Sequence, residues 1–336
     1  MHDTTFSIAF PVISAATGSD VYYRRLQAGL AEHRIRADII PLATADEFVP
    51  GRLTRVRAQL RHYDLIHTNA DYGALLQVPG IPLVVTLHHD VFAPAFQRLT
   101  SLPQKLYHYG LLRHRIRTAL GACAAAICPS QATRDSARAT FGPLADRLQV
   151  IPNGIDTRRF SPGTAANAQR QLLFVGTLSR RKGADLLRPI MDQLGSGYRL
   201  TCVTTTAGTP FGTDHFQLVR HVALRDLPDW YRRCQLLLFP SRLEGFGYAV
   251  AEAMACGRPV VCTRASSLPE LVAHETGGLL CAPGDIAAFA AAVARIATDQ
   301  HLADRMGAHN RSRAVAQFDQ QVMLAHYVRL YQRLLA

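Results

Sequence analysis

Short apolar segments alternate with longer amphipathic ones along most of this chain. Runs of about four to eight apolar residues, rich in branched side chains, are typical of buried β-strands. The stretches between them carry apolar residues at helical spacing, and this alternation predicts parallel sheets covered by helices. The predicted strands lie at 6–13, 37–42, 64–67, 82–87, 124–129, 172–176, 198–204, 236–239 and 259–262.

A small, polar stretch at 163–171 interrupts this alternation and predicts an inter-domain linker. We therefore expect an α/β fold of two doubly wound, Rossmann-like domains, at 1–162 and 172–318. Because the chain has 336 residues, of which 48% are hydrophobic, each domain is large enough to bury its own core. Residues 319–336 predict a final helix.

The clearest ligand-binding pattern lies between 236 and 262, where strand, loop, helix and strand follow one another. This order predicts a βαβ unit, and ligands of such units bind at the carboxyl ends of the strands. Gly245 and Gly247 lie in the loop, so the backbone there approaches a ligand closely. The helix that follows attracts anions at its N-terminus.

Two carboxylates, Glu244 and Glu252, flank the same loop with seven residues between them. A carboxylate that faces a phosphate is repelled, so these side chains are suited to accept hydrogen bonds from hydroxyl groups. A nucleotide sugar offers both groups, because its anionic diphosphate lies between two polyols. The alternative is that Glu244 caps the helix and Glu252 is only solvated.

A second strand-to-helix loop, at 177–183, carries Arg180, Arg181 and Lys182, and such a set of cations is typical of a phosphate clamp. Lys182 is one of only two lysines among 37 basic residues, so arginine is the usual cation of this chain. A lysine here indicates that the position needs a compact ammonium group. No Gly-Lys-Ser/Thr ends the loop, which is therefore not a P-loop.

Two further candidate positions follow strands of the first domain. His88 comes at the carboxyl end of the strand at 82–87, where this architecture places ligands, and its alternative is a hydrogen-bonded loop residue. Gly18 precedes the helix predicted at 21–33, and it either belongs to a ligand-binding loop or forms a plain turn. One glycine does not make the three-glycine dinucleotide fingerprint, which disfavours a nicotinamide-type site.

The stretch 92–120 is basic and amphipathic, and no acidic residue lies between Asp90 and Asp135. It is either a helix that covers the sheet with solvated arginines or a surface that rests on anionic lipid. Helical spacing predicts that Leu102, Leu106, Tyr109, Ile116 and Leu120 share one face. The cations of the stretch include Lys105, Arg113, Arg115 and Arg117.

Composition limits the cellular compartment and the kinds of binding partner that we expect for this protein. No apolar run approaches the ~18 residues of a membrane span, and the N-terminus lacks the pattern of a signal peptide. The seven cysteines form no C-x-x-C pair, which indicates buried thiols in a reducing cytosol. The net charge of +12 suits nucleic acid, a phosphate-rich substrate or an anionic membrane, but no recognised nucleic-acid motif appears.

The glycine loop resembles the donor-site signature of glycosyltransferase family 4. The resemblance rests on Glu244-Gly-Phe-Gly, on the spacing to Glu252 and on Ala-Met-Ala-Cys-Gly-Arg-Pro-Val-Val at 253–261. It continues in Pro-Asn-Gly-Ile-Asp at 152–156 and in Leu-Pro-Asp-Trp-Tyr at 227–231. It implies the GT-B fold, in which two domains face a cleft. It also implies a retaining, metal-independent transferase that uses a UDP- or GDP-linked sugar and no cofactor.

The resemblance implies a role for each candidate residue. Glu244 would hold the sugar hydroxyls, Glu252 the ribose, and His88 would line the face on which the sugar reacts. Relatives often carry an arginine directly after the strand glycine; here that position is Thr177, so Arg180 or Arg181 must assist Lys182 in binding the pyrophosphate. The expected catalytic residues are Glu244 and His88, and the expected donor-binding residues are Gly18, Arg181, Lys182, Leu227, Gly245, Phe246, Gly247 and Glu252.

The implied reaction is hexosyl transfer, with retained anomeric configuration, to a hydroxyl of a glycan or lipid-linked acceptor. It would serve cell-surface polysaccharide, lipopolysaccharide or glycolipid biosynthesis, in the cytoplasm or peripherally on the inner face of the plasma membrane through 92–120. No metal or nucleic-acid partner is expected, and the helix at 319–336 would cross back onto the first domain. The alternatives are a hydrolysing sugar-nucleotide epimerase of the same fold and a non-catalytic binder of nucleotide sugar or nucleic acid.

Overall fold

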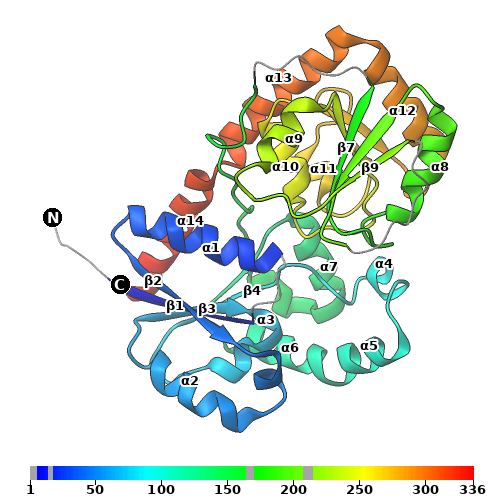
Figure 1. Cartoon of the computed structure of the whole chain (residues 1–336). Coiled ribbons are helices and arrows are strands. Elements are labelled where there is room, and N and C mark those ends of the chain that lie inside the picture. Colours follow the sequence, from blue (N-terminus) through cyan, green and yellow to red (C-terminus); the bar gives the residue numbers. More distant parts are fainter. Residues whose placement is uncertain (1–5, 14–17, 164–169, 207–214) are drawn as a thin grey trace. The chain divides into compact units, whose positions relative to one another are not determined.

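The computed structural model describes residues 6–13, 18–163, 170–206 and 215–336. The chain divides into two compact units (Figure 1): unit 1 combines residues 1–154 with 320–336, and unit 2 comprises residues 155–319. Residues 155–162 thus belong to unit 2, although the sequence predicted them at the end of the first domain. Most of the predicted linker, residues 164–169, lies outside the described ranges.

Unit 1 is built on a six-stranded parallel sheet in the order β2-β1-β3-β4-β5-β6. The register pairs Ile8 of β1 with Leu65 of β3. Its strands are almost continuously apolar because helices cover both faces of the sheet. They are β1 Ser7–Ile13, β2 Arg36–Leu42, β3 Leu65–Asn69, β4 Leu83–Thr86, β5 Ala125–Cys128 and β6 Leu148–Val150.

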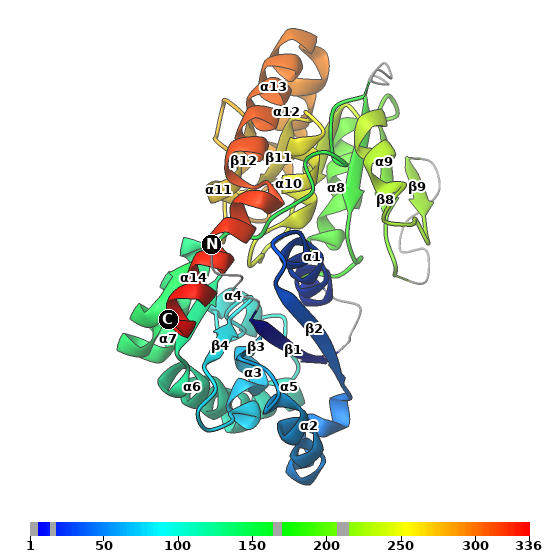
Figure 2. The same ribbon diagram turned by 90° about the vertical axis from the view of Figure 1, so that its left-hand side faces the viewer.

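One face of this sheet packs against α1 and α14, the blue and red helices of Figure 1. The two helices approach closely, since a Cβ at Gly29 of α1 would lie 2.1 Å from Leu324 of α14. Figure 2 shows the chain passing from α13 of unit 2 directly into α14 of unit 1. The helices of unit 1 are α1 Gly18–Glu32, α2 Leu53–Leu60, α3 Ala70–Gly73, α4 Pro94–Gln97, α5 Leu102–Tyr107, α6 Arg113–Ala122, α7 Gln131–Phe141 and α14 Gln320–Leu335.

Unit 2 has a second six-stranded parallel sheet, in the order β12-β11-β10-β7-β8-β9. The strands are β7 Gln171–Val175, β8 Arg199–Val203, β9 Phe216–Val219, β10 Leu236–Phe239, β11 Val260–Thr263 and β12 Gly278–Cys281. The helices are α8 Ala184–Leu194, α9 Leu227–Arg233, α10 Tyr248–Ala255, α11 Leu268–Leu271, α12 Ile286–Thr298 and α13 Gln300–Gln317.

Both sheets are doubly wound, which confirms the predicted α/β class. In unit 1 the strand order reverses between β1 and β3, and in unit 2 it reverses between β7 and β10. A crevice forms outside the carboxyl ends of the strands at such a switch point, because the connections leave toward opposite faces. The loops after β7 and β10 are therefore the first place to look for a ligand site in unit 2.

The predicted single apolar face of 92–120 is wrong. A five-residue π-helical turn, His108–Leu112, separates α5 from α6, and its wider winding rotates the second helix relative to the first. Leu102 and Leu106 are consequently 76% and 75% exposed, whereas Ile116 and Leu120 are buried. Sequence spacing does not reveal the extra residue in the turn.

Two further predictions concern membranes and thiols. All seven cysteines are buried, as predicted, and none forms a disulfide; burial raises the pKa of most of these thiols, as at Cys202. Across the described ranges, no helix combines the length and the apolarity needed to cross a membrane.

Candidate functional site

Two strand-to-helix loops meet at the switch point of unit 2. The loop at 176–183 follows β7, and the loop at 240–247 follows β10, the neighbouring strand. Gly183 joins them: its φ is +73°, and a Cβ there would lie 2.1 Å from the carbonyl oxygen of Pro240. Only glycine permits both this conformation and this approach, so the two loops form one structure.

Lys182 and Glu244 form an ion pair between these loops. The ammonium nitrogen of Lys182 lies 2.6 Å from Oε1 of Glu244, and their side chains are 17% and 8% exposed. The hydroxyl of Ser241 donates to the same carboxylate oxygen over 2.6 Å. The predicted lysine and glutamate are therefore brought together, and Glu244 does not cap helix α10, which excludes that alternative.

The cations keep Glu244 ionised. Burial by itself would raise the pKa of Glu244, but the charges of Lys182 and Arg181 offset it and hold the pKa below its usual value. Arg181 reaches the same loop, since its guanidinium donates to the carbonyl oxygen of Leu243 over 3.2 Å. Two cations and one carboxylate leave a net positive charge at the loops, which suits an anionic ligand.

The glycine loop is held by two serines for which the sequence predicted no role. Ser266 Oγ accepts the backbone N–H of Glu244 over 2.9 Å. The hydroxyl of Ser267 donates to the carbonyl oxygens of Glu244 and Phe246, at 3.1 and 2.8 Å. Gly247 then begins α10 with a φ of +103°, and the loop amides precede the helix N-terminus.

Phe246 contributes its backbone to this loop, while its side chain belongs to the core. The ring is only 4% exposed and contacts the rings of Tyr248 and Phe318, with centroid distances of 5.4 and 5.8 Å. Its predicted place in a donor site therefore rests on its backbone groups alone.

Glu252 and Leu227 connect the site to helix α9. Glu252 lies on α10 and is 5% exposed, which excludes the alternative of a solvated side chain. Its Oε2 accepts the hydroxyl of Tyr231 over 3.0 Å. Tyr231 lies on α9, whose first residue is Leu227, a partly buried side chain against the core. The bond holds α10 and α9 together beside the glycine loop.

His88 and Gly18 lie in unit 1. Gly18 is the first residue of α1. His88 follows β4, and its Nε2 lies 3.0 Å from Oδ1 of Asn69 at the carboxyl end of β3. Burial, with a smaller contribution from the charge of His89, lowers the pKa of His88 to about 3, so its imidazole is neutral at physiological pH.

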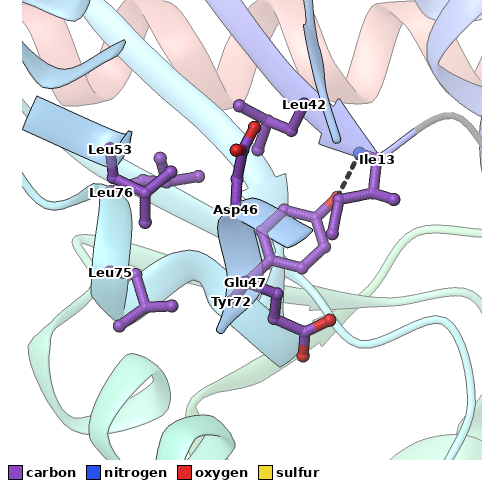
Figure 3. Close-up of a pocket in the computed structure, with 8 residues that line it drawn as sticks. All are labelled: Ile13, Leu42, Asp46, Glu47, Leu53, Tyr72, Leu75 and Leu76. Carbon is purple, nitrogen blue, oxygen red and sulfur yellow. Dashed lines mark hydrogen bonds between the residues drawn. The ribbon is translucent and has the colours of Figure 1, made fainter. Parts of the chain in front are cut away.

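A small cavity in unit 1 has two acidic side chains, Asp46 and Glu47, among the residues that line it (Figure 3). Its volume is about 10 Å³, the space of one water molecule, so it is too small for a sugar ring. Nearby, burial and the charge of Glu47 raise the pKa of Asp71 to about 6. The cavity is lined by Ile13, Leu42, Asp46, Glu47, Leu53, Tyr72, Leu75 and Leu76. Within the ranges given above, no group of three or more histidines, cysteines or acids is placed to hold a metal ion.

Comparison with known proteins places each unit in a described group. Residues 12–159 match the family model described as Glycosyltransferase Family 4. Residues 169–299 match the model described as Glycosyl transferases group 1. The two matches together cover most of both units.

Two curated relatives are similar at the level of sequence. The MMP alpha-(1->4)-mannosyltransferase of Mycolicibacterium hassiacum is 28% identical over 312 residues, which cover 85% of this chain and 74% of the relative. The D-inositol 3-phosphate glycosyltransferase of Xylanimonas cellulosilytica is 29% identical over 200 residues. That match spans 51% of this chain and 48%, or about half, of the relative.

Solved structures share the fold across nearly the whole chain. Sucrose-phosphate synthase from Thermosynechococcus elongatus superposes with a TM-score of 0.83 at 21% identity, covering 98% of this chain and 99% of that chain. Anabaena Alr3699/HepE in complex with UDP-glucose has a TM-score of 0.77 at 20% identity, covering 98% and 100%. The predicted GT-B architecture, with two parallel six-stranded sheets, is thereby confirmed.

Proposed function

This chain belongs to glycosyltransferase family 4, and from that premise we propose that it transfers a hexosyl group from a UDP- or GDP-linked sugar to a hydroxyl group. The observation that carries the proposal is the buried pair of Lys182 and Glu244 beside the glycine loop. The pair puts a phosphate-binding cation next to a carboxylate that accepts hydrogen bonds from sugar hydroxyls. A solved neighbour with the same fold binds UDP-glucose.

The proposed chemistry retains the configuration of the anomeric carbon. The bond from this carbon to the diphosphate oxygen breaks while the bond to the acceptor oxygen forms on the same face. The acceptor's proton passes to the departing phosphate. Lys182, Arg181 and the amides of the glycine loop stabilise the charge that grows on the diphosphate, without a metal ion.

Binding of the sugar nucleotide would rearrange the partners of Glu244. The ammonium group of Lys182 then binds the diphosphate. The carboxylate of Glu244 accepts hydrogen bonds from the sugar hydroxyls instead of from Lys182. Glu252, held by Tyr231, accepts the ribose hydroxyls, and the backbone near Leu227 contacts the base. By resemblance to the family, we assign His88 a role toward the reacting sugar and Gly18 a role toward the diphosphate.

We further propose that the acceptor is a glycan or lipid-linked molecule and that unit 1 rests on an anionic membrane. We define the exposed apolar patch as the exposed side chains of Phe48, Val49, Leu102, Leu106 and Tyr109. Phe48 contacts the ring of Tyr107 at the end of α5, with ring centroids 5.9 Å apart. Lys105 lies on α5 between the two leucines, and no acid occurs between Asp90 and Asp135.

This location suits an enzyme of cell-surface polysaccharide, lipopolysaccharide or glycolipid synthesis. The exposed leucines enter the interface while the cations attract anionic lipid headgroups. The protein would then work in the cytoplasm, peripherally on the inner face of the plasma membrane.

A panel of nucleotides tests the transferase proposal. We expect UDP or GDP and one of their sugars to raise the melting temperature of the full chain, and expect binding to persist in the presence of a chelator. Product analysis by NMR should then show a glycoside with the anomeric configuration of the donor. Release of free nucleotide with an epimerised sugar would identify a hydrolysing epimerase instead. Binding without turnover on any acceptor would identify a non-catalytic binder, and salt-dependent binding of nucleic acid alone would contradict the proposal.

A further inference from the structure

Buried hydrogen bonds link α14 and α1 to each other and to the sheet of unit 1. His67 of β3 is fully buried, and its two ring nitrogens each lie 2.7 Å from a hydroxyl oxygen, one of Tyr331 and one of Thr86. The hydroxyl of Tyr22 donates to that of Tyr327 over 2.6 Å. Helices α1 and α14 are thereby tied to each other, and α14 is tied to β3.

Asn69 ends β3 at this switch point and contacts two neighbours through one atom. Its Oδ1 accepts the hydroxyl of Tyr23 over 2.9 Å and lies 3.0 Å from Nε2 of His88. An amide oxygen only accepts hydrogen bonds, so the Nε2 of His88 must carry the proton. A neutral imidazole protonated at Nε2 has its lone pair on Nδ1.

Packing holds the imidazole in this orientation. The rings of Tyr22 and Tyr23 meet the ring of His88 edge to face, with centroid distances of 5.1 and 6.0 Å. The bond from Tyr22 to Tyr327 fixes the first of these rings. A flip of the imidazole by half a turn would move Nε2 away from Asn69 Oδ1, and other rotations would also disrupt the two aromatic contacts.

We propose that Asn69 is a positioning residue, which fixes His88 as the neutral Nε2–H tautomer and so presents Nδ1 as an acceptor for a ligand hydroxyl. The ligand group at His88 is then a neutral hydrogen-bond donor, such as a sugar or acceptor hydroxyl, rather than a phosphate or carboxylate. The identity of that hydroxyl rests on the proposed function, whereas the tautomer does not.

NMR of the full chain labelled with ¹⁵N-histidine tests the tautomer directly. The His88 signal is assigned by its loss in His88→Gln. We expect the wild-type ring to be protonated at Nε2 and to stay neutral below the usual histidine range, because burial and His89 lower its pKa. A ring protonated at Nδ1, which would require the amide nitrogen of Asn69 to face it, overturns the proposal.

Variants of Asn69 separate positioning from general stability. In Asn69→Ala the tautomer preference should be lost, and kcat/KM should fall about tenfold, the value of one hydrogen bond. In Asn69→Asp the carboxylate should keep the Nε2 proton and raise the pKa of His88 above its wild-type value, against the opposing charges of His67 and His89. A His88 spectrum unchanged in both variants contradicts the proposal.

Tyr23→Phe is the matched control. It removes the other hydrogen bond to Asn69 Oδ1 but keeps the ring that packs on His88, so the Nε2–H tautomer should persist. A tautomer change in this control equal to that in Asn69→Ala would overturn the role of Asn69. If no transferase activity is found with any sugar, the proposed function fails, and the NMR results still decide the inference.

Discussion

The ammonium group of Lys182 lies 2.6 Å from the carboxylate of Glu244, and each side chain is mostly buried. Each charge is therefore balanced by the other before any ligand arrives. Removing one partner leaves the other buried and unpaired, which is strongly destabilising. Variants at this pair must be compared for stability as well as for activity.

Lys182→Ala should lower kcat/KM by a factor that corresponds to a loss of about 3 kcal/mol of transition-state stabilisation, because it removes the main cation at the diphosphate. Steady-state kinetics with the active donor measure this loss. Lys105→Ala, which removes the only other lysine, is the control and should retain activity. Wild-type turnover in Lys182→Ala would argue against the diphosphate clamp.

The same pair predicts a coupling in stability. Lys182→Ala alone should reduce the free energy of unfolding by about 3 kcal/mol, since Glu244 is left as a buried charge. The double variant Lys182→Ala/Glu244→Gln should recover part of that loss. Urea unfolding of the two single variants and the double variant measures the coupling, and additive losses would mean that the ion pair is absent.

Gly183→Ala should disrupt the contact between the two loops. A Cβ at this position would lie 2.1 Å from the carbonyl oxygen of Pro240, so the loops must separate and nucleotide binding should weaken. Gly195→Ala is the control, because Gly195 also has a positive φ, +80°, but a Cβ added there would meet no atom within 4 Å. With a ψ of −177° at Gly195, the control should lose about 1–3 kcal/mol of stability and keep its affinity for nucleotide. Equal nucleotide affinity in the two variants, measured by calorimetry, would contradict the argument.

His67 should make the protein less stable as the pH falls. Burial lowers its pKa from 6.5 to about 3, so between these values the unfolded chain binds a proton that the folded chain does not. Its contribution is complete above pH 6.5 and declines by about 1.4 kcal/mol per pH unit below it. His67→Gln should therefore show a shallower fall in unfolding free energy between pH 6 and about 4. An unchanged slope would show that His67 is not buried in its neutral form.

Membrane binding through the exposed apolar patch should depend on Leu102 and Leu106. Aspartate at either position should weaken binding to anionic vesicles about tenfold, because it removes apolar area and adds repulsion. Val315→Asp, at a residue 42% exposed on α13, is the control and should bind normally. If vesicle binding is unchanged by the leucine substitutions and by salt, the proposed membrane contact is contradicted.

Charge reversal in this region should be limited to Arg113 and Arg117. Arg115 is buried, and its guanidinium lies 2.9 Å from Oε1 of Glu47, so reversing it would destabilise unit 1 rather than test lipid contact. Arg113→Glu and Arg117→Glu should weaken binding most at low salt. Sequence spacing alone did not distinguish these three arginines.

The sequence predicted most of the sheets because their strands are continuous apolar runs. It missed β9, whose residues 216–219 are all partly or fully exposed at the sheet edge, so no buried pattern marks it. It also missed β6, which has only three residues, 148–150, and β12, a buried strand of four residues, 278–281, that begins with a glycine. The π-helical turn at 108–112 escaped prediction because no residue type marks its extra residue per turn.

Within the candidate site, short local motifs could be predicted, but hydrogen bonds between residues far apart in the sequence could not. The loops with Lys182 and Glu244 are short runs with readable chemistry, and the switch point brings them together. Asn69 lies 19 residues from His88, and Ser267 lies 23 from Glu244, so their hydrogen bonds depend on strand order. The doubly wound order could have indicated Asn69, because it ends the strand beside the reversal.

Helix α14 sets the order in which the protein can fold during synthesis. Unit 1 needs Tyr327 and Tyr331 to complete its core, yet the ribosome makes them only after all of unit 2. Unit 2 is contiguous in sequence, so it can finish folding while unit 1 is still incomplete and has an exposed apolar face. Until then that face is a natural target for chaperones, and nascent chains stalled within residues 155–319 should expose it to proteases.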